Sequence, residues 1–163
     1  LFVGTYEKQR AQTILNIGAA GFNVDIFGTR WDKCKIKFPK NVKLHYKELT
    51  DIAYASAIST SKVTLGFLRK QNKDTQTSRT FEVPACNGLL LMEHTVQQEE
   101  FFSPDSEVLF FRDDREAVEK IEKVLLDDEL NRVIRLRGRQ KVQASDYTYT
   151  DMCNNVIRFL KEL

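Results

Sequence analysis

The sequence predicts an α/β fold, a Rossmann-like doubly wound parallel sheet of about six strands with helices on both faces. Short apolar segments of strand length recur along the chain, and segments with the 3.6-residue periodicity of amphipathic helices lie between them. The strand segments are apolar almost throughout, as parallel strands are when helices cover both faces of a sheet. With 163 residues, the chain is long enough for one hydrophobic core, so we expect a single domain over residues 1–163.

Strands and helices are expected to alternate along the chain. The predicted strands are residues 1–4, 22–27, 42–46, 63–68, 89–92 and 108–111. The predicted helices are residues 7–20, 50–59, 81–86 and 96–101, a helix capped by Asp113 and Asp114, and residues 127–142 and 151–163. Right-handed crossovers place the carboxyl ends of parallel strands at one edge, where doubly wound sheets bind their ligands. We therefore expect the site in the loops after the first, third, fourth and fifth strands.

The composition argues against several classes of function. The 25 basic and 23 acidic residues nearly balance, so no strong positive field favours a nucleic acid as partner. The cysteines, Cys34, Cys86 and Cys153, show neither zinc-ligand spacing nor a disulfide framework, which favours a reducing, cytoplasmic location. No apolar run approaches the roughly 20 residues of a transmembrane helix, and no signal peptide is visible, so any membrane association is expected to be peripheral.

The most informative segment for chemistry is residues 78–93, which reads Ser-Arg-Thr-Phe-Glu-Val-Pro-Ala-Cys-Asn-Gly-Leu-Leu-Leu-Met-Glu. The hydroxyls of Ser78 and Thr80, the guanidinium of Arg79 and the first amides of the predicted helix gather at the positive end of a helix dipole. Such a place is favourable for phosphate. One turn further, the carboxylate of Glu82 is suited to accept two hydrogen bonds from a vicinal diol.

This pattern resembles the spore-maturation (CgeB-like) branch of group 1 glycosyltransferases. In that branch an arginine-threonine-phenylalanine-glutamate run leads through Pro-Ala-Cys to a glycine and an apolar strand, as residues 79–92 do here. The resemblance continues through residues 99–102, 108–111 and 117–121, and it is weaker in residues 2–5, at Arg10 and in residues 147–149. It implies that the fold is the carboxyl-terminal half of a GT-B glycosyltransferase.

The resemblance also implies a function. The chain would bind a nucleoside-diphosphate sugar and present it for transfer of the glycosyl group to an unknown acceptor, as half of a hexosyltransferase-like enzyme. Because the sequence starts with Leu1-Phe2-Val3-Gly4, inside a predicted strand and without an initiator methionine, we expect a domain excised from a longer chain. The amino-terminal acceptor domain would then be missing, and the isolated domain would bind the donor but hardly turn it over.

Residue roles for the nucleoside and the sugar follow from the same resemblance. Glu82 matches the second acid of a two-glutamate motif and would bind the ribose hydroxyls. The first acid falls eight residues earlier at Asp74, in a loop facing the transferred sugar, where aspartate reaches less far than the family's glutamate. The family reads the base through the loop after the third strand, where Tyr46 is the candidate for stacking.

The diphosphate is neutralised in other GT-B enzymes by an arginine and a lysine just after the first strand of this half. Here Thr5 occupies the expected arginine position, with Lys8 and Arg10 nearby, and Arg79 would share their role. Gly4 and Thr5 would let the backbone approach the phosphates closely. No Asp-x-Asp pair is present, so we expect cationic side chains in place of a bound metal, and no cofactor.

Simpler interpretations of these residues stay open. Arg79 and Glu82 also suit a surface ion pair at a helix start, and Lys8 and Arg10 suit a solvated helix face. The departures from the family pattern at the diphosphate and sugar positions motivate a second hypothesis, a catalytically degenerate scaffold that serves protein contacts. A receiver-like or flavodoxin-like module is disfavoured because no acidic cluster follows the first strand.

Overall fold

The computed structural model of the chain describes residues 1–69 and 72–162. Within them, the strands are β1 (Phe2–Val3), β2 (Val24–Phe27), β3 (Val42–Leu44), β4 (Thr64–Gly66), β5 (Leu90–Glu93) and β6 (Leu109–Phe111). The helices are α1 (Lys8–Ala19), α2 (Asp51–Thr60), α3 (Arg79–Ala85), α4 (Val96–Glu99), α5 (Asp114–Leu126), α6 (Asp128–Gln143) and α7 (Tyr149–Lys161), with a 3-10 turn η1 at Trp31–Lys33. Every predicted strand and helix is present, which confirms the α/β class.

The strands of the described chain pair in parallel. β1 pairs with β2 and β2 with β3, while β4 pairs with β5 and β5 with β6. Two hydrogen bonds join these groups: the Leu1 amino nitrogen donates to the Val63 carbonyl at 2.9 Å, and the Leu65 amide donates to the Leu1 carbonyl at 2.8 Å. The strand order is therefore β3-β2-β1-β4-β5-β6, with its reversal between β1 and β4. Sheets of this kind bind ligands at such a switch point.

The sheet has a hydrophobic core on each face. Side chains of α1 and α5 pack against one face, and side chains of α2 and α3 pack against the other. Successive residues of β5 alternate between the cores: Leu91 joins the core beneath α1 and α5, whereas Leu90 and Met92 join the core beneath α2 and α3. Because the strand is buried on both faces, its sequence is apolar throughout. The predicted doubly wound sheet is confirmed.

Two helices begin two residues earlier than predicted. α3 starts at Arg79 rather than at residue 81, and α7 starts at Tyr149 rather than at residue 151. In α7 the Thr148 side chain accepts a hydrogen bond from the Asp151 amide, and the Asp151 carboxylate accepts one from the Thr148 amide. This capping box fixes the start of the helix. The predicted end of α7 at residue 163 lies outside the described residues.

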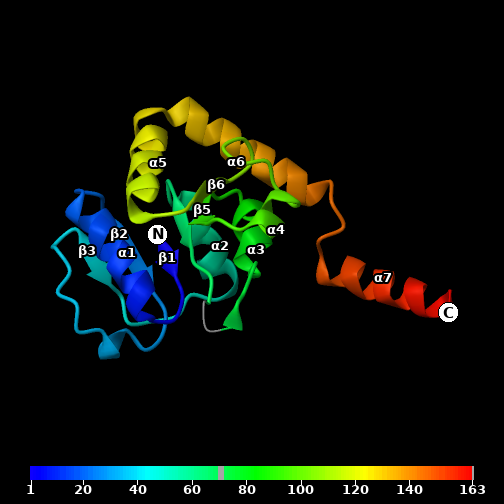
Figure 1. Cartoon of the computed structure of the whole chain (residues 1–163), viewed down its shortest axis with the longest axis horizontal. Helices are drawn as coiled ribbons and strands as arrows, with labels where there is room; N and C mark the ends of the chain where they lie inside the picture. The colour runs from blue at the N-terminus through cyan, green and yellow to red at the C-terminus, as the bar shows by residue number, and fades with distance from the viewer. Residues whose placement is uncertain (70–71, 163) are drawn as a thin grey trace.

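The last helix, α7, lies apart from the rest of the domain. Its described residues include no buried side chain, and the helix extends away from the sheet (Figure 1). By contrast, α6 buries Asn131, Ile134 and Gly138 and packs against α3 and α5. Across residues 1–69 and 72–162, no helix combines the length and the apolar character needed to cross a membrane.

Candidate functional site

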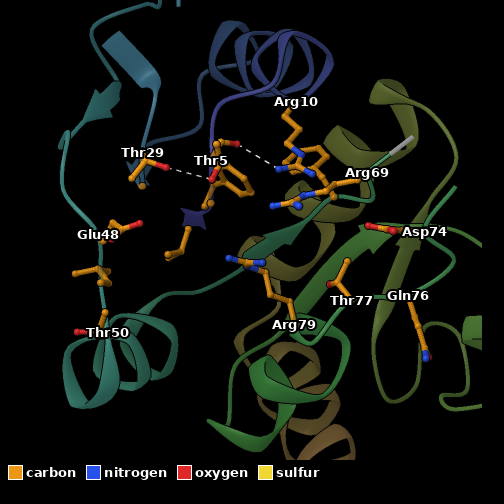
Figure 2. A pocket seen from close by; sticks show the side chains of 16 residues that line it. Thr5, Arg10, Thr29, Glu48, Thr50, Arg69, Asp74, Gln76, Thr77 and Arg79 are labelled. Atoms are coloured by element: carbon orange, nitrogen blue, oxygen red, sulfur yellow. Dashed lines mark hydrogen bonds between the residues drawn. The ribbon is translucent and has the colours of Figure 1, made fainter. Parts of the chain in front are cut away.

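A cavity of about 380 Å³ opens at the carboxyl ends of the strands, at the switch point between β1 and β4 (Figure 2). Residues 2–5, 28–29, 48–50 and part of the loop between β4 and α3 line it. The loops after β1, β3 and β4, three of the four named from the sequence, thus contribute to the cavity. The loop after β5 does not line it, and the turn after β2 does.

Three arginines from different elements line this cavity: Arg10 from α1, Arg69 from the loop after β4, and Arg79 from the first turn of α3. Figure 2 shows their guanidinium groups directed toward a common centre. Arg10 is largely buried, donates from Nη1 to the Thr5 carbonyl at 3.2 Å, and lies 3.0 Å from Glu7 Oε1. Arg69 Nε lies 3.9 Å from the same Glu7 oxygen, so one carboxylate serves two guanidinium groups.

The positive charge of these arginines is only partly compensated. Burial lowers the pKa of Arg10, and the neighbouring charges of Arg69 and Arg79 lower it further, while Glu7 and Glu93 act in the opposite direction. Within the described residues, the side chain of Arg79 forms no hydrogen bond or ion pair. Three clustered cations, two of which share one nearby carboxylate, Glu7, favour the binding of an anion.

Three buried polar atoms of the cavity lining have no hydrogen-bond partner among the described residues: Nε of Arg10, Nε of Arg79 and Oγ1 of Thr77. A buried donor without an acceptor costs about 1–3 kcal/mol, so such atoms are uncommon in folded proteins and call for an explanation. Guanidinium groups and hydroxyls are the donors that a phosphate group requires, and Arg10, Arg79 and Thr77 all line this cavity.

Two acidic residues also line the cavity. Asp74 lies in the loop between β4 and α3, and Glu48 lies in the loop between β3 and α2. In Figure 2 they stand on opposite sides of the arginine cluster. A central group of cations with carboxylates and hydroxyls at the margins suits a ligand that has an anionic centre and polar, uncharged ends.

The floor of the cavity is made by backbone at the ends of β1 and β2. The Gly4 amide donates to the Phe27 carbonyl at 2.8 Å, and the Gly28 amide donates to the Lys47 carbonyl at 2.7 Å. The buried indole of Trp31 donates from Nε1 to the Gly4 carbonyl at 2.9 Å. The Trp31 side chain therefore helps to hold the Gly4 backbone in place at the end of β1.

The sequence led us to expect that the first backbone amides of α3 are free to bind phosphate, and the structure differs for three of them. The Thr80 amide donates to the Thr77 carbonyl, and the amides of Phe81 and Glu82 donate to the Ser78 carbonyl, at 2.9–3.0 Å. These amides are used within a tight first turn and are not available to a ligand. The Thr80 side chain is fully buried, where its hydroxyl accepts from the Thr77 amide at 3.2 Å. Thr80 does not line the arginine cavity.

Ser78 and Glu82 face a second, mostly apolar groove of about 590 Å³ between α3 and the α6–α7 connection. The carboxylate of Glu82 accepts a hydrogen bond at Oε2 from the Tyr54 hydroxyl of α2 at 3.0 Å. Gln76 and Thr77 line both the groove and the arginine cavity, so the two spaces adjoin. Glu82 thus lies beside the arginine cavity without lining it.

The structure brings five of the residues singled out from the sequence to the cavity, namely Gly4, Thr5, Arg10, Asp74 and Arg79. Lys8 is exposed on α1, and Tyr46 is 64% exposed; neither lines the cavity. The sequence interpretation missed Arg69 and Thr77. Arg69 directly follows the fourth predicted strand, so the rule that sites lie after strand ends was sufficient to find it.

The described residues contain no group of three or more His, Cys, Asp or Glu side chains placed to bind a metal ion. The Thr5 hydroxyl lies 3.2 Å from the Thr29 hydroxyl, so this pair bridges the ends of β1 and β2.

Comparison with known proteins places this chain in a family. A family model described as glycosyl transferase-like matches residues 9–158. The chain is similar in structure to sucrose-phosphate synthase from Thermosynechococcus elongatus, with a TM-score of 0.73 and 13% identity, over 99% of this chain and 45% of that one. No curated protein matches the chain in sequence.

Two further solved structures show the same similarity. The C-terminal domain of a glycosyl transferase group 1 family protein from Francisella tularensis has a TM-score of 0.64 and 12% identity, over 88% of this chain and 83% of that one. A glycosyltransferase from Rickettsia africae ESF-5 has a TM-score of 0.69 and 11% identity, over 99% of this chain and 47% of that one. This chain spans less than half of that enzyme and of the synthase.

These similarities show that the fold is that of the carboxyl-terminal domain of GT-B glycosyltransferases. The predicted fold class is confirmed to that level. The match to the family is broader than the spore-maturation branch suggested by residues 78–93.

Proposed function

This chain belongs to the glycosyl transferase-like family, and from that premise we propose that it binds the nucleoside-diphosphate sugar of a GT-B glycosyltransferase. The observation that supports this most directly is the convergence of Arg10, Arg69 and Arg79 on a cavity at the switch point of the sheet. A diphosphate carries negative charge and acceptor oxygens, which Nε of Arg10 and Nε of Arg79 lack among the described residues.

The proposed chemistry explains why cations are needed there. In glycosyl transfer, an acceptor hydroxyl attacks the anomeric carbon, the bond from that carbon to the phosphate oxygen breaks, and the electron pair leaves with the nucleoside diphosphate. Negative charge therefore grows on the diphosphate in the transition state. Preorganised donors aimed at that charge stabilise the transition state more than the ground state. Arg79, which has no other acceptor among the described residues, is the first candidate for this role.

The two acids have distinct proposed roles. Asp74 lines the cavity and would face the transferred sugar. Glu82 lies one turn along α3 from Arg79, beside the cavity, and would accept hydrogen bonds from the ribose hydroxyls. Tyr46 is not part of the cavity lining, so in this proposal the loop residues Glu48, Leu49 and Thr50 lie nearest to the nucleotide on that side.

Isothermal titration calorimetry tests this proposal directly. Uridine diphosphate, guanosine diphosphate and inorganic pyrophosphate are each titrated into the wild-type chain at low ionic strength. We expect at least one nucleoside diphosphate and pyrophosphate to bind with dissociation constants below the millimolar range. If none of the three binds at millimolar concentration, the cavity is not a diphosphate site.

The alternative is a degenerate scaffold that keeps the fold and has lost the donor site. It is favoured by Thr5, whose hydroxyl pairs with Thr29 at the place where the resemblance to GT-B enzymes implies an arginine. Glu82→Ala distinguishes the two hypotheses, because a donor domain loses affinity for the nucleoside diphosphate whereas a scaffold shows no change. Hexosyl transfer to an acceptor by the longer protein is proposed on the same basis, and the chain alone is expected to bind without appreciable turnover.

A further inference from the structure

A single side-chain hydrogen bond links the two helices that follow β3 and β4. The hydroxyl of Tyr54 in α2 donates to Oε2 of Glu82 in α3 at 3.0 Å. The loops that lead into these two helices both line the arginine cavity, one through Thr50 and the other through Thr77. The bond therefore joins the first turns of the two helices whose preceding loops line the cavity.

Tyr54 is placed among charged groups of the site. Burial raises the pKa of the Tyr54 hydroxyl, the charge of Glu82 and the hydrogen bond to it raise it further, and Arg79 acts in the opposite direction. Because the pKa is raised above the ordinary tyrosine value, the Tyr54 hydroxyl is protonated at neutral pH and can donate to Glu82. The same interactions indicate that Tyr54, Glu82 and Arg79 form one cluster.

The hydrogen bond restricts the carboxylate of Glu82. A glutamate side chain has several rotatable bonds. If only the ligand fixed its orientation, the side chain would lose conformational entropy on binding, and the affinity would fall. With Oε2 bonded to Tyr54, the remaining oxygen, Oε1, forms no hydrogen bond with the described residues. The acid is thus oriented before any ligand arrives, with acceptor capacity left on both oxygens.

We propose that Tyr54 is a positioning residue for donor binding: its hydroxyl orients the Glu82 carboxylate to accept hydrogen bonds from the ribose of the nucleotide. This inference rests on the proposed function and adds to it a residue that the sequence pattern did not single out. In this proposal, Tyr54 and Glu82 together allow the protein to distinguish a ribose from a sugar that lacks its hydroxyls.

The test compares three ligands on Tyr54→Phe and wild type by calorimetry. The ligands are the nucleoside diphosphate that binds more tightly, its 2′,3′-dideoxy analogue, and inorganic pyrophosphate. We expect wild type to prefer the ribose ligand by about tenfold or more, since hydrogen bonds to a charged group are involved. In Tyr54→Phe this preference should fall several-fold, with no change for pyrophosphate. Ser56→Ala, which removes an exposed hydroxyl from the same helix α2 and lies outside both cavity linings, should behave as wild type.

A double-mutant cycle separates positioning from a general structural effect. If Tyr54 acts through Glu82, adding Tyr54→Phe to Glu82→Ala should cause no further loss of ribose preference. Glu82→Gln keeps the side-chain volume and removes the charge, and it should lose the preference even if Tyr54→Phe does not fold. An unchanged preference in Tyr54→Phe or in Glu82→Gln overturns the inference, as does an equal loss of affinity for all three ligands.

The failure of this inference differs from that of the proposed function. If wild type binds neither pyrophosphate nor a nucleoside diphosphate, the arginine cavity is not a diphosphate site and both ideas fall. If wild type binds pyrophosphate and the nucleotide but does not discriminate against the dideoxy analogue, the diphosphate site stands and the role given to Glu82 and Tyr54 is wrong.

Discussion

The carbonyl oxygen of Gly4 faces the α-carbon of Gly28 so closely that a β-carbon on Gly28 would lie 2.1 Å from it. The same oxygen accepts the hydrogen bond from Trp31 Nε1. Gly28 also has φ of 135°, a region that side-chain-bearing residues rarely adopt. The close approach of β1 and the turn after β2, which forms the cavity floor, therefore depends on glycine at position 28.

Gly28→Ala is expected to lower the free energy of unfolding by about 3 kcal/mol or more. The added methyl group collides with the Gly4 carbonyl, and that backbone cannot move without losing the hydrogen bonds of Gly4 to Phe27 and Trp31. Gly21→Ala is the matched control, since Gly21 also has positive φ, at 98°, and its β-carbon would meet nothing within 4 Å. We expect it to cost only about 1–2 kcal/mol from backbone strain. Urea unfolding followed by circular dichroism measures both, and equal losses would refute the steric argument.

Arg79 and Arg10 should respond differently to replacement by glutamine. Arg79 has no side-chain partner among the described residues, so Arg79→Gln is expected to weaken pyrophosphate binding by about tenfold or more without lowering stability. Arg10→Gln should weaken both binding and stability, because it removes the ion pair with Glu7 and the hydrogen bond to the Thr5 carbonyl.

For both arginine variants, calorimetry measures the affinity for pyrophosphate and urea unfolding measures the stability. A loss of stability in Arg79→Gln equal to that in Arg10→Gln would mean that Arg79 serves the fold rather than a ligand. Binding that stays intact in both variants would count against the diphosphate site itself.

Glu116 should make stability depend on pH. Partial burial alone would raise the pKa of Glu116, but hydrogen bonds from the Arg112 amide and Lys120, with the charges of both residues, outweigh it and lower the pKa. Because the folded pKa lies below the unfolded one, the stabilisation is complete above the ordinary glutamate value of about 4.3 and is lost as the pH falls through the lowered folded value.

Glu116→Gln is therefore expected to lower the free energy of unfolding by about 1 kcal/mol at pH 7, the usual size of a helix-start interaction. The difference from wild type should shrink toward zero as the carboxylate of wild type is protonated at low pH. Urea titrations at pH 7 and at successively lower pH provide the measurement, and a difference independent of pH would contradict the linkage.

Removal of α7 should leave the domain folded. None of the described residues of α7 is buried, and its apolar side chains, among them Phe159 and Leu160 at 62% each, are exposed. We expect the free energy of unfolding of a chain ending at residue 148 to differ from that of the full chain by about 0.5 kcal/mol or less, as is usual for changes at the surface. Tyr147 is retained because its ring packs against Phe81 and Phe101. A larger loss would show that α7 contributes to the core.

The elements of the fold could be read from the sequence because burial repeats locally. The apolar run of residues 89–92 indicates a strand covered on both faces, and the pattern in residues 113–126 indicates a helix with one buried stripe. The exact starts of α3 and α7 were missed by two residues, because the tight first turn at Thr77 and the capping box at Thr148 depend on backbone geometry.

Side-chain directions at the strand ends were less predictable. Tyr46 follows β3 as expected, but its backbone has φ of 48° and its ring is exposed, which no periodicity in the sequence indicates. Glu82 lies on the predicted helix, but its orientation is set by Tyr54 from another helix. Such contacts join segments that are distant in the chain, so local patterns carry no information about them.

The sequence by itself determined the α/β class, the order of strands and helices along the chain, and three of the loops that line the cavity. Only the tertiary structure decided that Arg10, Arg69 and Arg79 meet in one cavity and that Lys8 does not join them. The physical reason is the placement of β4 beside β1, which brings the start of α1 and the start of α3 together across the switch point. Hydrophobic periodicity specifies which residues are buried, whereas the meeting of cations depends on which strands become neighbours.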